Sequence, residues 1–301
     1  MGTPEFAVPS LSALYEAGYD IAAVVTAADK PAGRGLQLTE SAVKKFALQK
    51  NLKILQPEKL KSPEFIDALA ALKADVQVVV AFRMLPEVVW NMPPLGTINL
   101  HGSLLPQYRG AAPINWAIIN GEKETGVTTF KLQHTIDTGN ILLQEKIEID
   151  ETDTAGTLHD KMMQTGAQLL LHTLDELSVG NTSETIQPEA TQSGEGLKHA
   201  PKIFTDTCKI EWNNNVDSIY NFIRGLSPYP TAFTFLKGKK LKIYNAEKET
   251  STDTKGPGMV FTDKKTFLKF SAKDGYILLK EIQLDGKKKM RIEDFLRGWR
   301  D

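Results

Sequence analysis

The sequence is poor in cysteine and in long apolar runs. Cys208 is the single cysteine among 301 residues, which excludes an internal disulfide framework and fits a reducing compartment, so we expect a cytoplasmic protein. The longest apolar stretch that predicts one element covers residues 76–82 and is too short to span a bilayer, so no membrane partner is expected. Because no histidine is near it in the sequence, Cys208 is predicted to be a small core residue.

Motifs for three common chemistries are also missing. The five histidines, at positions 101, 134, 159, 172 and 199, show no metal-ligand spacing with a second acidic or thiol cluster, so no metal is expected. Ser103 lacks the G-x-S-x-G pattern of a serine hydrolase. The single DTG triplet, at residues 137–139, does not make an aspartic protease, which needs two carboxylates that share a proton.

The charge is present but unevenly distributed along the chain. Residues 203–301 carry 19 lysines and arginines against 13 aspartates and glutamates, a net charge of +6, whereas residues 1–202 carry −7. This division indicates two domains and a polyanionic partner for the second. An excess of solvated lysines on a small domain explains the charge alone equally well.

The first half of the sequence alternates β-branched runs with helical patterns, which predicts an α/β fold with a doubly wound, mostly parallel sheet. Ligands of such sheets bind beyond the carboxyl ends of the strands. Strands are expected at 21–26, 76–82 and 96–100, and helices at 6–17, 41–50 and 64–72.

The later part of the sequence predicts further strands at 126–132 and 141–149, and helices at 112–120 and 154–177, the second bent or broken near Gly166. Beyond residue 203, short strands between turns and one helix at 216–224 indicate a small OB-like β-barrel. We therefore divide the chain into a catalytic domain (1–185), a linker (186–202) and a C-terminal domain (203–301).

The first helix begins without a preceding strand. Thr3 is expected to cap it, with Pro4 at the favoured first helical position. A doubly wound fold usually has a central strand before this turn. We expect the first strand, of about five residues, to lie upstream of Met1.

Two polar residues follow an apolar run at a predicted strand end. Asn99 and His101 are two apart, so on a strand they face the same side. A lone histidine there is more often a hydrogen-bonded structural group. Together with Asp137, however, these side chains suit acyl transfer to an amine, in which Asn donates to an oxyanion and His moves a proton.

The segments "INLHGSLLPQYRGAAPINWAIINGEKETGVTTFKL" and "IDTGNILLQEKIEI" resemble the core of the folate-dependent formyltransferases. The loop "TAADKPAGRGLQL" and the C-terminal segments "IRGLSPYPTAF" and "KKKMRIEDFL" resemble the members that formylate methionine on initiator tRNA for translation initiation. The resemblance implies transfer from 10-formyltetrahydrofolate to that amine, by an enzyme that we expect to be a monomer.

The resemblance also assigns residues to roles. The catalytic group is Asn99, His101 and Asp137. The folate would lie against Ser103, Leu104, Leu105 and Pro106, and against Phe82, Arg83, Met84 and Leu85, where Arg83 departs from the small turn that the family has. The tRNA would contact Arg34, Lys287, Lys288 and Lys289.

Two other functions remain open on the sequence. One is formyl transfer to a different amine, such as an amino-sugar nucleotide or glycinamide ribonucleotide. The second is a folate-binding or RNA-binding protein without activity. The complete set of Asn99, His101 and Asp137 argues against the second alternative.

Overall fold

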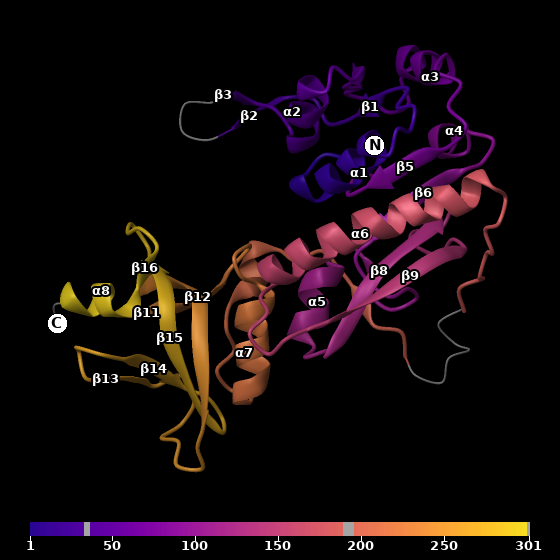
Figure 1. Ribbon diagram of the computed structural model, residues 1–301. Helices are drawn as coiled ribbons and strands as arrows, with labels where there is room; N and C mark the ends of the chain where they lie inside the picture. The colour runs from indigo at the N-terminus through magenta and orange to yellow at the C-terminus, as the bar shows by residue number, and fades with distance from the viewer. Residues whose placement is uncertain (33–36, 189–195, 300–301) are drawn as a thin grey trace. The chain divides into compact units, whose positions relative to one another are not determined.

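A computed structural model describes residues 1–32, 37–188 and 196–299 (Figure 1). The chain forms two compact units, each built from several segments. The first unit comprises Met1–Arg109, Gly126–Ile147 and His159–Lys198, and the second comprises Gly110–Thr125, Glu148–Leu158 and His199–Asp301. No described helix is long and apolar enough to cross a membrane.

The first unit contains a four-stranded sheet in the order β5-β6-β8-β9. β5 (Gln77–Val80) and β6 (Thr97–His101) are parallel, β8 (Glu124–Lys131) is antiparallel to β6, and β9 (Ile141–Glu148) completes the sheet. The prediction of a mostly parallel sheet is therefore corrected at β8. β8 and β9 are joined by residues 132–140, a connection shorter than the crossover of a dozen or more residues that parallel neighbours need.

The helices of the first unit begin close to where the sequence predicts. α2 (Ala42–Gln49) and α3 (Pro63–Ala70) are capped by the side chains of Ser41 and Ser62, which accept from backbone N–H groups three residues on. Thr3, by contrast, is not the cap of the first helix: a 3₁₀ turn, η1 (Glu5–Ala7), precedes α1 (Val8–Glu16). α1 starts late because a second proline, Pro9, lies in its first turn, where its missing N–H costs nothing.

The long helix α6 (Ala155–Ser178) is continuous, so the expected break near Gly166 is not found. A Cβ at Gly166 would lie 2.8 Å from Leu100 Cδ2, and the glycine therefore allows α6 to approach β6 closely. A 2.8 Å hydrogen bond between the hydroxyls of Thr173 and Thr129 joins the same helix to β8. α6 thus runs along the strands that carry the candidate site (Figure 1).

A separate parallel pair, β1 (Val24–Val25) with β4 (Ile54–Leu55), lies beside β5 through the first two residues of the chain. The Gly2 N–H donates to Val25 O at 3.0 Å, and the Val80 N–H donates to Met1 O at 2.9 Å. Gly2 forms a parallel bridge with Val80. Met1 and Gly2 therefore occupy a strand position between β1 and β5, at the carboxyl end of both.

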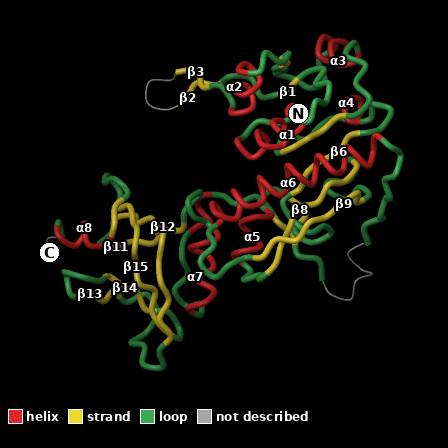
Figure 2. Tube along the Cα trace, viewed as in Figure 1, coloured by secondary structure: helices red, strands yellow, loops and turns green. Residues whose placement is uncertain are grey.

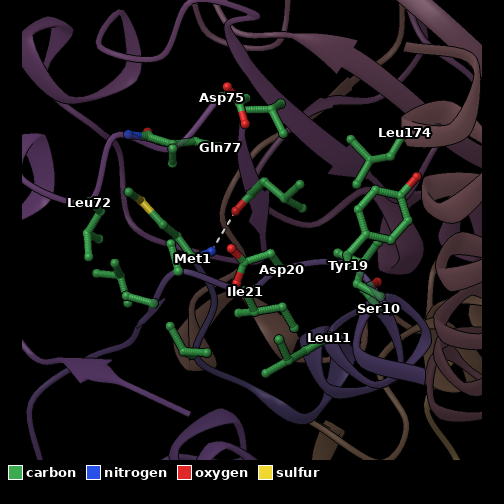
Figure 3. A pocket seen from close by; sticks show the side chains of 18 of the residues that line it. Met1, Ser10, Leu11, Tyr19, Asp20, Ile21, Leu72, Asp75, Gln77 and Leu174 are labelled. Carbon is green, nitrogen blue, oxygen red and sulfur yellow. Dashed lines mark hydrogen bonds between the residues drawn. The ribbon is translucent and has the colours of Figure 1, made fainter. Parts of the chain in front are cut away.

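Upstream of this strand position lies a cavity of about 520 Å³, lined mainly by apolar side chains (Figure 3). The amine of Met1 is buried there and donates to Val78 O at 2.5 Å. Ser10 Oγ, also at the wall, is buried without a hydrogen-bond partner among the described residues. Other lining residues are Leu11, Leu14, Leu69, Leu72 and Leu174.

The second unit is dominated by an antiparallel sheet in the order β11-β12-β15-β14-β13, with β16 paired to β15 (Figure 2). Helix α7 (Val216–Gly225) packs on this sheet through Ile219 and Ile223, and Cys208 is buried in the same core, as predicted. The strands are β11 (Ala232–Leu236), β12 (Lys239–Thr250), β13 (Val260–Thr262), β14 (Leu268–Ser271), β15 (Gly275–Leu284) and β16 (Met290–Arg291), followed by α8 (Ile292–Arg297).

The remaining elements of the two units are short. They are β2 (Lys30–Ala32), β3 (Gln37–Thr39), α4 (Glu87–Trp90), β7 (Arg109–Gly110), α5 (Pro113–Ile119), β10 (His199–Ala200) and η2 (Thr205–Cys208).

Candidate active site

The candidate site begins at the carboxyl end of β6. Asn99 and His101 lie two residues apart on this strand and face the same side, as the sequence predicts. In the register of the sheet, Val79 pairs with Asn99 and Val80 with Leu100. The segment that follows β5 is therefore adjacent to His101 at the same edge of the sheet.

The His101 ring is buried, with 7% of its surface exposed, and its orientation is fixed by the main chain. Its Nε2 lies 3.0 Å from Tyr108 O. A carbonyl oxygen only accepts, so Nε2 carries the proton and Nδ1 of the neutral ring is an acceptor. The sequence did not predict this partner, because Tyr108 acts through its backbone.

Asp137 approaches His101 from the turn between β8 and β9. Asp137 Oδ2 lies 3.9 Å from His101 Nδ1, beyond hydrogen-bond length but within the range of an ion pair. Asp137 has a left-handed backbone with φ of 54°. Gly139 follows where a Cβ would lie 1.6 Å from Lys131 O, so only glycine fits this turn. The DTG triplet is therefore required by the shape of the turn as well as by the carboxylate.

A guanidinium also acts on this carboxylate. Arg109 is partly buried, and burial lowers the pKa of its guanidinium, while the negative charge of Asp137 acts in the opposite direction. Arg109 belongs to the "YRG" triplet, to which we assigned no role from the sequence. The carboxylate is thus influenced by an imidazole and a guanidinium.

Hydrogen bonds to β8 and β9 hold the loop after His101. The Thr128 hydroxyl donates to Ser103 O at 2.6 Å and accepts from the Leu105 N–H at 3.2 Å. Gln144 Nε2 donates to Leu105 O at 3.0 Å. Ser103 is fully buried, and its hydroxyl donates to Gln107 O at 2.7 Å. The side chains of Ser103 and Leu105 therefore face the protein, and the hydrogen bonds from Thr128 and Gln144 fix the loop backbone beside His101.

The segment after β5 has no regular secondary structure, and within the described part of the chain the backbone groups of residues 82–85 pair with no protein group. Leu85 is buried and anchors the segment, while Met84 is 73% exposed. Arg83 does not face the site: its guanidinium donates to the carbonyls of Glu58, at 2.9 Å, and of Pro57. These contacts leave the edge of the segment open.

The profile of the formyl transferase family matches residues 1–174, and that of its C-terminal domain matches residues 202–300. The chain belongs to the formyl transferase family. A methionyl-tRNA formyltransferase of Parabacteroides distasonis is 55% identical over 306 residues, covering 100% of this chain and 94% of that protein. The resemblance seen in the sequence is confirmed.

Solved structures share the fold of this formyl transferase at low identity. WlaRD, a sugar 3N-formyl transferase determined in the presence of dTDP and 5-N-formyl-THF, matches with a TM-score of 0.68 and 21% identity, covering 95% of this chain and 97% of its own. HypX from Aquifex aeolicus, in complex with tetrahydrofolic acid, matches with a TM-score of 0.60 and 18% identity. Here 84% of this chain covers 46% of HypX.

The residues predicted to contact tRNA come from two other parts of the sequence of this formyl transferase. Arg34 falls outside the described residues. Lys287, Lys288 and Lys289 are exposed in the turn between β15 and β16. Lys289 forms an ion pair of 2.7 Å with Glu281, so its charge is partly neutralised. Among the described residues, no group of three or more His, Cys, Asp or Glu side chains forms a metal site.

A second basic turn lies beside these lysines, and the sequence analysis missed it. The Asp285 N–H donates to Lys240 O at 2.9 Å, which brings the β15–β16 turn next to the β11–β12 hairpin. The hairpin carries exposed Lys237 and Lys239. The "KGKK" pattern of a glycine turn flanked by lysines was the available signal.

Proposed function

We propose that the protein transfers the formyl group of 10-formyltetrahydrofolate to the amino group of methionine esterified to initiator tRNA. The observation that supports the proposal is the 3.9 Å approach of Asp137 Oδ2 to His101 Nδ1, with Asn99 on the same side of β6 as His101, in a chain of the formyl transferase family. The amine as methionyl-tRNA is supported by a relative of that name, 55% identical over the whole length.

The reaction begins when the neutral amine attacks the formyl carbon. An α-amino group with a pKa of about 7.7–8.0 is partly neutral at physiological pH, so no covalent nucleophile is needed. The C–N bond forms and the formyl oxygen takes the negative charge. Asn99 is partly exposed at the end of β6, and its side-chain amide donates to this oxyanion.

His101 moves the proton from the amine to the folate. Because Nε2–H is bound to Tyr108 O, Nδ1 is the nitrogen that accepts the proton released by the attacking amine. The imidazolium formed lies 3.9 Å from Asp137 Oδ2, whose negative charge stabilises it. His101 then returns the proton to N10 of the folate as the C–N10 bond breaks, which regenerates the neutral imidazole.

The folate fits the open backbone at the strand ends. The pterin ring presents a polar edge of donors and acceptors, and residues 82–85 offer backbone groups without protein partners in the described structure. Residues 103–106 form the opposite side, with their main chain held by Thr128 and Gln144. A bound pterin would therefore be near both His101 and the exposed side chain of Met84.

The tRNA would bind at the basic end of the C-terminal sheet, which we propose to be an OB-like barrel. The exposed lysines of the β11–β12 and β15–β16 turns, Lys237, Lys239, Lys287 and Lys288, offer several cations to phosphates. Phe235, 50% exposed on β11, adds a surface on which a base can stack. Asn99, His101 and Asp137 belong to one chain, so a monomer has the groups that catalysis needs. We expect this monomer to act in the cytoplasm.

A formyl-transfer assay with methionyl initiator tRNA and 10-formyltetrahydrofolate tests the proposal. We expect product with both substrates, strong loss in His101→Ala, and no product when the tRNA is uncharged. An amino-sugar nucleotide, glycinamide ribonucleotide and free methionine serve as competing amines. Faster formylation of one of these, or folate and tRNA binding without any transfer, would refute the proposed function.

A further inference from the structure

Gln187, which lies outside the motifs named from the sequence, contacts the turn that carries Asp137. Its side chain is 6% exposed. Its Nε2 donates to two backbone oxygens of the turn, Asp137 O at 3.0 Å and Gly139 O at 2.7 Å. Both hydrogens of this amide are thus used on the two residues on either side of Thr138, one of which is Asp137 itself.

The other end of the same amide binds Arg109. Gln187 Oε1 accepts from Arg109 Nε at 3.0 Å and from Arg109 Nη2 at 2.6 Å. A guanidinium only donates and a backbone carbonyl only accepts, so the amide has one possible orientation between them. Gln187 therefore joins the guanidinium that interacts with Asp137 to the backbone of the Asp137 turn.

Neighbouring contacts place Gln187 at this position. Thr185 and Ile141 exchange backbone hydrogen bonds of 2.8 and 2.9 Å, which lays the segment beside the start of β9. Glu184 accepts from Asn140 Nδ2 at 2.8 Å and pairs with Lys131 at 2.5 Å. These contacts dock the segment but do not touch Asp137, so the segment and the amide of Gln187 can be tested separately.

The geometry at Asp137 explains why such support matters. The carboxylate lies 3.9 Å from His101 Nδ1 and is not fixed there by a direct hydrogen bond between the two groups. Its position depends on a turn whose residue 137 has a positive φ of 54°. A displacement of about 1 Å in a group of this kind can lower a rate by about a hundredfold.

We propose that Gln187 is a positioning residue for formyl transfer: its amide holds the backbone of Asp137 and Gly139, with Arg109, so that the Asp137 carboxylate faces His101. This inference rests on the proposed function. Gln187 lies between the two family matches, which cover residues 1–174 and 202–300. The inference gives this connecting segment a role in the site.

Two variants of Gln187 test the inference. Gln187→Leu removes all four hydrogen bonds, whereas Gln187→Glu keeps the acceptor for Arg109 and replaces the donor with an oxygen that repels both carbonyls. We expect both to lower kcat by about tenfold to a hundredfold, with the folate KM within twofold.

Glu184→Gln is the matched control, since it alters the same segment but keeps an acceptor for Asn140, and its kcat should stay within twofold. Hydrogen–deuterium exchange over residues 133–140 gives a readout without activity, and it should be faster in both Gln187 variants. If the parent forms no product yet exchange rises, the proposed function fails while the contact stands. Unchanged exchange, kcat within twofold in Gln187→Glu, or an equal loss in Glu184→Gln would each overturn the inference.

Discussion

The buried amine of Met1 should make the stability of the first unit depend on pH between about 5 and 8. Burial lowers the pKa of this amine from its ordinary value of 8.0 to about 5, because the charged form loses its hydration in the cavity. Within this range the unfolded chain binds a proton that the folded chain does not. Stability therefore rises as the pH rises, and it is lowest below the folded pKa.

The magnitude follows from the two pKa values. A shift of about three units corresponds to about 4 kcal/mol, with one unit worth 1.36 kcal/mol. Linkage between the two states gives a cost of about 3 kcal/mol at pH 5.5, about 1.4 kcal/mol at pH 7 and about 0.4 kcal/mol at pH 8. The cost disappears when a peptide group replaces the amine, because an amide N–H donates to Val78 O without carrying a charge.

The perturbation is a five-residue extension in front of Met1, made in two forms. A Gly/Ser extension converts the amine into an amide and adds little apolar surface. A Val/Ile extension also places side chains in the cavity of about 520 Å³ between β1 and β5. Calorimetric unfolding at pH 5.5 and pH 8, with retention of Met1 checked by mass, separates charge removal from cavity filling.

We expect both extensions to be stabilised relative to the parent by about 3 kcal/mol more at pH 5.5 than at pH 8. The Val/Ile form should exceed the Gly/Ser form at every pH, since its side chains leave water. The three chains are otherwise identical, so pH effects that do not involve the amine cancel in the comparison. Equal pH dependence in the parent and the Gly/Ser form would refute the reasoning about the amine.

Three further predictions concern the reaction and the tRNA. His101→Ala and Asp137→Ala should each slow single-turnover transfer by about 10²–10⁴-fold, with tRNA affinity by filter binding unchanged; near-normal rates would remove the proton path. Affinity for tRNA should fall steeply as salt is added, and a flat response would contradict phosphate binding. Lys239→Ser and Lys288→Ser should each reduce the slope of log K against log[salt] by about 1. Arg34→Ala should lower kcat/KM for charged tRNA without changing folate affinity in a titration, and identical kinetics would leave Arg34 without a role.

The features that could be predicted from the sequence are those set by residues close together in the chain. The caps at Ser41 and Ser62 are short-range features, because a serine hydroxyl reaches the N–H three residues on. The shared side of Asn99 and His101 follows from the period of two in a strand. The start of the first helix was placed too early, at Thr3 and Pro4, because Pro9, which lies in the first turn of α1, was not weighed.

Contacts between residues far apart in the chain could not be predicted in this way. Resemblance assigned Asp137 to the site, but its distance from His101 depends on the β8–β9 turn, which crosses to β6 only in the folded sheet. The hydrogen-bond acceptor for Nε2 of His101 is the backbone oxygen of Tyr108. Because every residue type has this oxygen, the sequence cannot reveal the contact. Gly166 had a visible signal that was misread, since a glycine in a helix permits close packing as well as a break.

The two unpredicted contacts at the site share one physical reason. A reacting imidazole needs one nitrogen fixed and the other available, and a backbone carbonyl fixes Nε2 without adding a charge that would compete with Asp137. The carboxylate needs a fixed position from which its negative charge acts on His101. Gln187 meets this need because a neutral amide holds the backbone of the turn. His101 and Asp137 therefore act on the proton, while the Tyr108 carbonyl and the Gln187 amide, together with Arg109, set their geometry.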